Sequence, residues 1–267
     1  MIGQTKVLTE ISKISDGQFP RFSIICGLRG SGKTSLIKYI NDTKIHAEYN
    51  EISSIDDIRQ ICIDAPMYTE PRLYVLSDFD SMNFRAKESI LKLCEDIPPN
   101  LYIVIETISV ENIKQTLLSR ANVIKLSGYT DTELTAFCHT LEGVDENEIS
   151  YLISSFKTPG DIARAHSCGI RSLVEFCQKV LSNIYNANTF NAMKIADSLK
   201  LKADGQGYEL DLFFTVLMNC AALSLPVDKA HQLILSTSHT LQKLNMKSIN
   251  KLMLFDAWLF EVKGVSI

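Results

Sequence analysis

Hydrophobic and polar positions follow two different patterns along this chain. Up to about residue 128, short apolar runs at 21–27, 73–76, 101–106 and 122–126 alternate with segments of helical spacing. Short apolar runs bounded by polar segments are typical of buried strands, and strands separated by helices form a parallel sheet covered on both faces. The intervening helices are predicted at 33–40, 54–65, about 83–95 and 111–119.

Beyond residue 128 the strand pattern stops and only helical spacing remains. Three short amphipathic helices are predicted, followed by longer ones, with Asp, Thr or Pro near the starts of the short helices. The chain is therefore predicted to have an α/β domain at 1–128, a small helical domain at 129–170 and an all-helical domain at 171–267. The helices are expected at 130–141, 145–156, 159–168, 172–187, 191–200 and 210–225, with a last pair between 227 and 262.

Composition excludes several classes of protein. The chain has 267 residues, 46% of them hydrophobic and 22% charged, which is typical of a soluble globular protein. The net charge of −4 gives no overall basic field, so DNA contact would need a local cluster or several copies. Seven cysteines without a CxxC pair argue against a disulfide framework or a zinc ribbon. With no apolar run long enough to span a bilayer and no secretory signal pattern, we expect a cytoplasmic protein.

One motif indicates nucleotide binding. GLRGSGKTS at 27–35 fits G-x-x-x-x-G-K-[ST] and lies between a predicted strand and a predicted helix. In that setting glycines let backbone N–H groups face phosphate oxygens, and the helix amino end adds a positive dipole. Lys33 would reach the β- and γ-phosphates, and Thr34 would take a Mg²⁺ position. The predicted nucleotide-binding residues are Gly27, Gly30, Ser31, Gly32, Lys33, Thr34 and Ser35.

Three further stretches occur in one order with tight spacing. They are IDDIRQI at 55–61, SDFDSMNFRAKESILKLCEDIPP at 77–99 and TLLSRANVIKL at 116–126. Together they resemble the sliding-clamp loader branch of the AAA+ ATPases, which includes the bacterial gamma and delta-prime subunits and the small subunits of replication factor C. IGQ at 2–4 resembles that family's V-G-Q box beside the adenine. The resemblance covers about the first 170 residues and implies ATP as the nucleotide, a helical lid and an oligomerising collar.

The resemblance also implies roles for single residues. Arg120, after Ser119, would be an arginine finger for the nucleotide of the neighbouring subunit, although it also suits an ordinary surface arginine. Thr107 would be the polar sensor that places the attacking water, or it would only cap the next segment. Arg59 and Lys92 match positions that follow the DNA backbone through a ring, although each alone suits a solvated helix.

Two departures from the family pattern bear on catalysis. Where relatives have two acids after the predicted strand at 73–76, this chain has Ser77 and Asp78. Asp78 then takes the place of the catalytic acid, and Ser77 replaces the metal-side acid and could hold Mg²⁺ only through a water molecule. Gly160 takes the place of a lid arginine, with Arg164 one helical turn further on as a substitute.

Three functions are consistent with these residues. The first is an ATP-hydrolysing clamp-loader subunit, weak in turnover because of Ser77, which joins other loader subunits in a pentameric ring. Such a ring opens a sliding clamp and loads it on primer–template DNA. The second is a structural loader subunit that binds nucleotide without hydrolysis and lends Arg120 to its neighbour. The third is another AAA+ protein, such as a helicase loader.

Overall fold

The computed structural model divides the chain into two compact units. The first unit comprises residues 1–134 and 158–160, and the second comprises residues 135–157 and 161–267. The three-domain division stays a prediction. The structure describes residues 3–52, 54–77, 79–82, 84–186, 199, 207–244 and 249–262.

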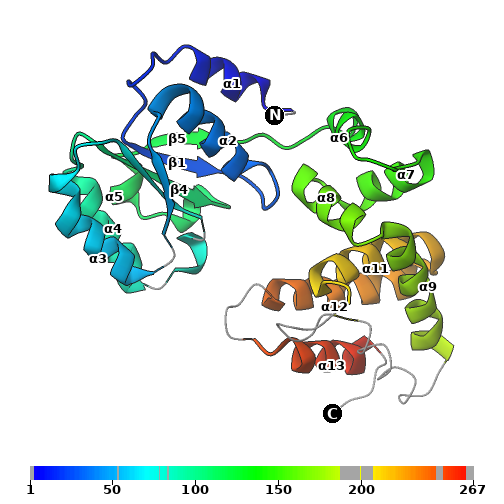
Figure 1. The fold of residues 1–267 in the computed structure, drawn as a ribbon. Coiled ribbons are helices and arrows are strands. Elements are labelled where there is room, and N and C mark those ends of the chain that lie inside the picture. The colour runs from blue at the N-terminus through cyan, green and yellow to red at the C-terminus, as the bar shows by residue number, and fades with distance from the viewer. Residues whose placement is uncertain are drawn as a thin grey trace. The chain divides into compact units, whose positions relative to one another are not determined.

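The first unit is built on a five-stranded sheet in the order β2-β3-β4-β1-β5, with every pair parallel (Figure 1). Parallel neighbours need crossover connections, and helices supply them here. The edge strand β2 was not predicted, because its sequence EYNE is polar and partly exposed. The strands are β1 (Phe22–Cys26), β2 (Glu48–Glu51), β3 (Arg72–Leu76), β4 (Leu101–Thr107) and β5 (Asn122–Lys125).

The helices of the first unit largely follow the predicted spacing. The N-terminal helix was not predicted, and the helix expected at 111–119 is a 3₁₀ turn (Val110–Asn112) followed by a short α-helix. A capping box formed by Ser54 and Asp57 starts the helix after β2. The α-helices are α1 (Thr5–Ser12), α2 (Lys33–Ile40), α3 (Ile55–Asp64), α4 (Phe84–Glu95) and α5 (Gln115–Leu118).

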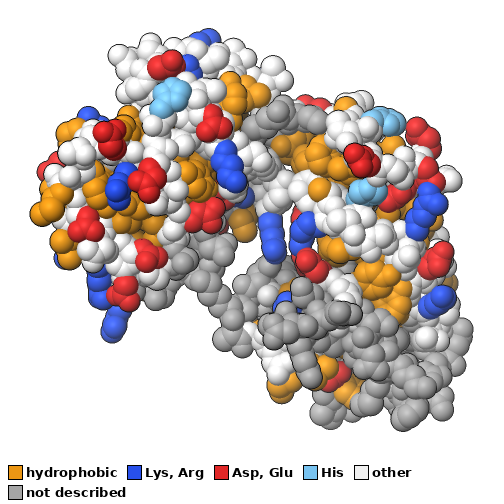
Figure 2. All heavy atoms as spheres, viewed as in Figure 1, with side chains coloured by type: hydrophobic (Ala, Val, Ile, Leu, Met, Phe, Trp, Pro, Cys, Tyr) orange, Lys and Arg blue, Asp and Glu red, His pale blue; other side chains and the backbone are white. Residues whose placement is uncertain are grey.

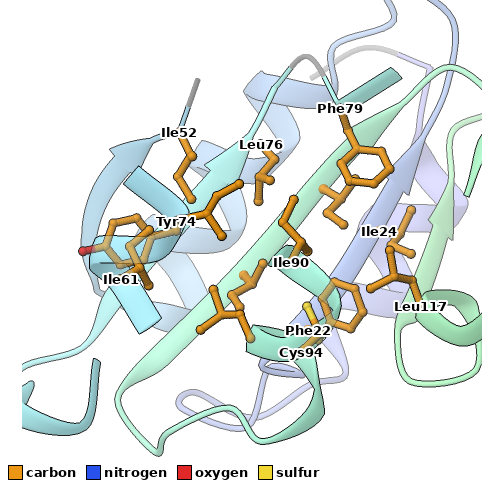
Figure 3. Packing of buried hydrophobic residues seen from close by; sticks show 14 of the residues in the cluster. Phe22, Ile24, Ile52, Ile61, Tyr74, Leu76, Phe79, Ile90, Cys94 and Leu117 are labelled. Carbon is orange, nitrogen blue, oxygen red and sulfur yellow. The ribbon is translucent and has the colours of Figure 1, made fainter. Parts of the chain in front are cut away.

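The sheet carries a hydrophobic core on each face, because successive strand side chains point to opposite sides. One core packs alternate strand residues such as Ile24, Leu76 and Ile105 against α3, α4 and α5 (Figure 3). The other packs the intervening residues, such as Val75 and Val104, against α1 and α2. The same alternation determines whether a side chain at the end of a strand faces α1 and α2 or faces α3, α4 and α5.

The second unit is helical. Its aromatic core brings Phe214 within 4.9 Å of Trp258 between ring centroids, and the Trp258 indole Nε1 donates to Thr237 Oγ1 at 2.9 Å. None of the described helices is both long and apolar enough to cross a membrane. Of the helix predicted at 191–200, all but Leu199 lies outside the described residues. The helices from residue 131 onward are α6 (Asp131–Cys138), α7 (Glu146–Ser155), α8 (Pro159–Ser167), α9 (Ile170–Asn186), α11 (Leu210–Ser224), α12 (Val227–Leu244) and α13 (Lys251–Val262). A parallel sheet with flanking helices, followed by helices alone, confirms the predicted fold class.

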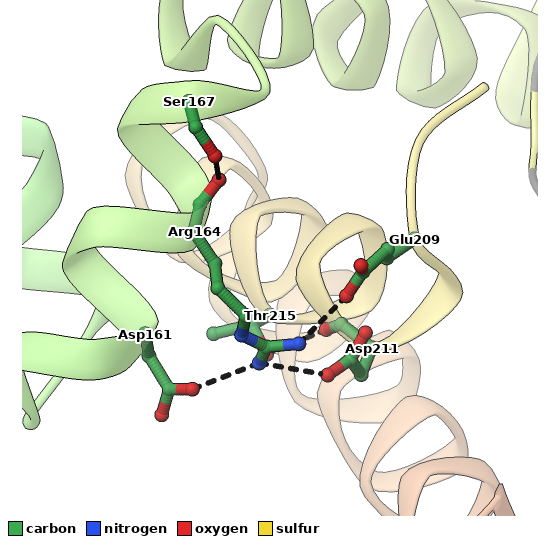
Figure 4. A network of polar contacts seen from close by, with 6 residues as sticks. All are labelled: Asp161, Arg164, Ser167, Glu209, Asp211 and Thr215. Carbon is green, nitrogen blue, oxygen red and sulfur yellow. Dashed lines mark hydrogen bonds and ion pairs between the residues drawn. The ribbon is translucent and has the colours of Figure 1, made fainter. Parts of the chain in front are cut away.

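An ionic cluster joins α8 to the start of α11 (Figure 4). The Arg164 guanidinium donates to Glu209 at 2.6 Å, Asp161 at 2.8 Å and Asp211 at 3.0 Å. Burial lowers the pKa of Arg164, but the hydrogen bonds and negative charges of Asp161 and Asp211 outweigh it and raise that pKa above its ordinary value. Arg164, the suggested substitute for the lid arginine of the family, is therefore bound by three carboxylates of its own unit.

We expect Arg164→Ala to lower the free energy of unfolding by about 1–2 kcal/mol, because three carboxylates would lose their shared donor. Partial exposure to solvent keeps the loss at this modest level. Urea denaturation followed by circular dichroism measures the change. Lys179→Ala, which removes the same charge from an exposed position of α9, is the matched control. Equal denaturation midpoints for the two variants would contradict a stabilising role for the cluster.

Candidate nucleotide-binding site

The loop between β1 and α2 has the backbone geometry of an anion-binding turn. Gly30 and Gly32 have φ angles of 74° and 85°, a region that side chains rarely adopt. Gly32 is also the N-cap of α2, so the amino end of the helix opens onto the loop. The loop N–H groups and the helix dipole together favour a phosphate here.

Lys33 and Thr34 begin α2, and both side chains are engaged at this edge of the sheet. Lys33 Nζ donates to the carbonyl oxygens of Gly27 at 2.7 Å and Leu28 at 2.9 Å, acceptors that phosphate oxygens would replace. Burial lowers the pKa of Lys33, and the nearby negative charge of Glu106 opposes this shift. Thr34 Oγ1 donates to Glu106 Oε1 at 2.9 Å. The loop thus places a cation and a hydroxyl beside an acid from β4.

Segments distant in sequence brace the loop. The buried Gln4 donates to the Ser127 carbonyl at 2.9 Å and accepts from the Ser127 N–H at 3.1 Å. Two residues further on, Tyr129 Oη donates to the Ser31 carbonyl at 2.8 Å. The sequence had singled out the IGQ segment, of which Ile2 lies outside the described residues, but it missed Tyr129. Ser31 is buried, and Ser35 is exposed on α2.

The residues after β3 bear on metal binding. Ser77 Oγ is buried and has no hydrogen-bond partner within the described part of the chain, so it has capacity for a further polar ligand. Asp78 lies outside the described residues, and its role as catalytic acid stays a prediction.

Gly160, which belongs to the first unit, donates its N–H to the Gly30 carbonyl at 2.9 Å. A Cβ at Gly160 would lie 2.6 Å from Gly30 Cα, so this approach requires glycine.

Thr107 ends β4 and joins a hydrogen-bond network around Asp80. The Thr107 hydroxyl lies 2.9 Å from Asp80 Oδ1 and 2.8 Å from the Ser109 carbonyl. Asp80 also accepts from the Ile108 N–H at 2.8 Å and from Asn112 Nδ2 at 2.9 Å. Asp80 therefore fastens the turn after β3 to the end of β4. Sequence reasoning gave Asp80 no role, and the use of Thr107 in placing water stays a prediction.

Arg120 lies at the opposite edge of the sheet from the phosphate loop. It precedes β5, whose first residue Asn122 pairs with Ser23 near the start of β1, whereas the loop follows Cys26 at the end of β1. At about 3.3 Å per residue, the strands separate these edges by roughly 10 Å or more. Arg120 is exposed, and its guanidinium donates to the Thr116 carbonyl at 2.8 Å. From this position, Arg120 does not reach the phosphate loop of its own chain.

Arg59 on α3 and Lys92 on α4 are both exposed. The two helices are neighbours, because Ile58 and Ile61 on α3 and Ile90 and Leu93 on α4 belong to the same hydrophobic core. Arg59 pairs with Asp56 at 3.2 Å in a solvent-exposed contact. Exposed pairs of this kind contribute little to stability, so Arg59 can exchange Asp56 for another anion.

The donor set fits a nucleotide-bound Mg²⁺. Mg²⁺ prefers oxygen ligands and usually combines one or two protein groups with phosphates and water. Thr34, the orphaned Ser77 hydroxyl and the Glu106 carboxylate supply such oxygens along one edge of the sheet. Over the described residues, no three His, Cys, Asp or Glu side chains gather into a metal site.

A glycine-rich loop after β1, in a parallel sheet of order β5-β1-β4-β3-β2 followed by helices, is the arrangement of an AAA+ fold. The family model for the DNA polymerase III delta subunit matches residues 6–130. A DNA polymerase III gamma subunit-related protein of Thermotoga maritima shares the fold with a TM-score of 0.57 at 14% identity, over 99% of this chain and 100% of that one.

Curated relatives match a smaller share of their own length. DNA polymerase III subunit gamma of Buchnera aphidicola is 23% identical over 203 residues, which cover 62% of this chain and 55% of that protein. Lon protease 1 of Borreliella burgdorferi is 25% identical over 221 residues, 76% of this chain and 26% of the protease. The chain thus spans about a quarter of the protease and just over half of the gamma subunit. The family model and the gamma-subunit match support the clamp-loader AAA+ family, as the motifs predicted, and the Thermotoga maritima structure shows a shared fold.

We expect Asp80→Ala to lower the free energy of unfolding by about 2–3 kcal/mol, because donors from three residues at the end of β4 lose a charged acceptor. The Ile108 amide should also exchange its hydrogen faster, which hydrogen exchange read by mass spectrometry detects. Asp96→Ala, at an exposed position after α4, removes the same charge as a control. Unchanged exchange at Ile108 would contradict the anchoring role.

Proposed function

We propose that this chain is an ATP-binding clamp-loader subunit that uses ATP binding and slow hydrolysis to help open a sliding clamp and load it on primed DNA. The position of Arg120 carries the proposal. An exposed arginine at the edge of the sheet opposite the phosphate loop can meet a nucleotide only in another subunit. A chain that binds nucleotide at one edge and offers a cation at the other suits a ring.

The catalytic roles follow from the loop and its neighbours. Lys33 holds the β- and γ-phosphates, Thr34 binds Mg²⁺, and Ser77 contacts a metal-bound water. Asp78 polarises the attacking water and Thr107 helps to place it. When bound, Mg²⁺ neutralises charge on the phosphates, and Arg120 of one subunit stabilises the transition state in the next.

Assembly into a ring is supported by apolar side chains on the C-terminal helices. Large apolar residues that face solvent usually mark contact surfaces when they gather. Leu223 and Val227, on either side of the turn between α11 and α12, are 72% and 84% exposed, and Met253 on α13 is 68% exposed. We propose that α11–α13 form the collar that holds loader subunits together in a pentamer.

DNA binding through Arg59 and Lys92 depends on this ring. Helix α3 carries Asp56, Asp57 and Asp64 beside Arg59, so one copy has no net attraction for phosphate there. On the face drawn in Figure 2, acidic and basic side chains of the described residues are interspersed rather than gathered into a basic band. Several subunits would place their cations in a row along the DNA backbone, and the summed contacts would bind it.

A second function, a structural loader subunit that binds ATP without hydrolysing it, is favoured by two observations. Ser77 brings no negative charge to the metal side of the site. Arg164 is bound by carboxylates of the second unit instead of serving as a lid sensor. Another AAA+ role, such as helicase loading, has no comparable support from these residues.

ATP turnover, with and without primed DNA and the clamp, separates the first two functions. We expect Lys33→Ala to weaken ATP binding by about 10–100-fold, because charged hydrogen bonds to phosphate are lost. The wild type should turn over ATP slowly, and Ser77→Asp should be faster if the missing charge limits the rate. Tight ATP binding without turnover in any mixture would leave only the structural subunit.

The arginine finger has its own test in the complex assembled with partner subunits. Arg120→Ala should reduce the complex's ATP turnover by about 1,000-fold at the neighbouring site and leave ATP binding to its own subunit unchanged. Arg85→Ala, which removes an exposed cation from α4, is the matched control. Equal turnover in the two complexes would show that Arg120 does not act on a neighbour.

A further inference from the structure

We infer that Glu106 on β4 is the metal-side acid of this site and supplies the negative charge that Ser77 lacks at the end of β3. The inference rests on the proposed binding of ATP with Mg²⁺. No motif in the sequence marked Glu106. With Glu106 in this role, the serine at position 77 does not leave the metal side of the site without a negative charge.

The strand register places Glu106 beside Ser77. β3 and β4 are parallel neighbours, and their pairing ends with Leu76 of β3 beside its partner Ile105 on β4. The next residues in this register are Ser77 and Glu106. The acid has therefore moved sideways by one strand at the same level of the sheet. Since β4 lies between β3 and β1, the move brings it nearer to the strand that leads into the phosphate loop.

The alternation of side chains also points Glu106 toward the loop. Val104, two residues earlier on β4, packs in the core on the α2 side of the sheet. Residues two apart on a strand share a face, so Glu106 faces α2 as well. Its side chain is buried, at 5% exposure, and Oε1 accepts from Thr34 Oγ1 at 2.9 Å. The carboxylate of Glu106 is therefore in direct contact with the Thr34 hydroxyl, which is proposed to bind the metal.

The chemistry of a hydroxyl explains how the pair would hold a cation. Thr34 has one proton to donate and two lone pairs to offer. Donation of the proton to Glu106 turns the lone pairs away from the carboxylate, where they can bind Mg²⁺. The carboxylate then sits behind the ligand, as outer partners of metal sites commonly do, and its charge offsets that of the ion. Ser77 Oγ, unpartnered among the described residues, is left to bind a metal water.

The second described acid near Lys33 has a different task. Burial lowers the pKa of Lys33, and the negative charges of Glu106 and Asp80 oppose this shift. However, Asp80 Oδ1 accepts from Thr107 and Asn112, and Oδ2 accepts from the Ile108 N–H. Both oxygens are therefore engaged by the end of β4. Of these two acids, Glu106 is the one in contact with the Mg²⁺-binding threonine.

The test compares nucleotide affinity with and without Mg²⁺, so it does not require turnover. A fluorescent, non-hydrolysable ATP analogue is titrated into the full-length protein in excess Mg²⁺ and in EDTA. We expect Glu106→Gln to keep its affinity in EDTA and to lose about 10–100-fold of the tightening by Mg²⁺, the usual effect of removing an outer partner. Glu51→Gln, at the end of β2, removes the same charge from the same edge and should behave as wild type.

Other outcomes test the metal role of Glu106 and the proposed ATP binding separately. Unchanged tightening by Mg²⁺ in Glu106→Gln, or an equal loss of affinity in Mg²⁺ and EDTA, would overturn the metal role. Should Glu106→Gln fail to fold, Glu106→Asp takes its place: its shorter side chain keeps the charge but withdraws from Thr34, so reduced tightening supports the role and full tightening overturns it. Wild-type protein that binds no nucleotide under either condition would instead refute the proposed function, and with it the basis of this inference.

Discussion

Parallel pairing of β1 with β4 sets Cys26 beside Thr107, and the chemistry of the first unit depends on that register. It brings the start of the phosphate loop alongside the end of β4, where Glu106 meets Thr34. A slip of β4 by one residue would turn Glu106 toward the opposite hydrophobic core and bury its charge without Thr34. Apolar residues packed on both faces of β4 oppose such a slip.

The same parallel order separates the two edges of the sheet. The phosphate loop, Ser77 and Glu106 lie at the carboxyl ends of the strands, whereas Arg120 lies before β5, at the amino ends. One subunit in this arrangement cannot bring its arginine to its own loop. The proposed ring agrees with this constraint, since in such a ring the arginine of a neighbour would act at the nucleotide of the next subunit.

Polar groups in the two units differ in whether their hydrogen-bonding groups have partners. In the second unit, three carboxylates surround Arg164 and tie α8 to α11. In the first unit, Asp80 is satisfied by donors from the end of β4, while Ser77 Oγ has no described partner. The satisfied groups stabilise the fold, and the unsatisfied hydroxyl lies where a ligand is proposed to bind.

Local patterns were enough to predict much of this protein. Apolar runs identified β1, β3, β4 and β5, and the glycines, Lys33 and Thr34 identified the phosphate loop, because strand burial and anion binding each need fixed residue types at short spacing. The polar strand β2 and the short helix α1 gave no such signal. Contacts between distant segments were decided only by tertiary structure: Gln4 with Ser127, Arg164 with Glu209, and Thr34 with Glu106. The acid in LYIVIE was visible in the sequence, but its partner was not, because strand register and the placement of α2 determine which hydroxyl it meets.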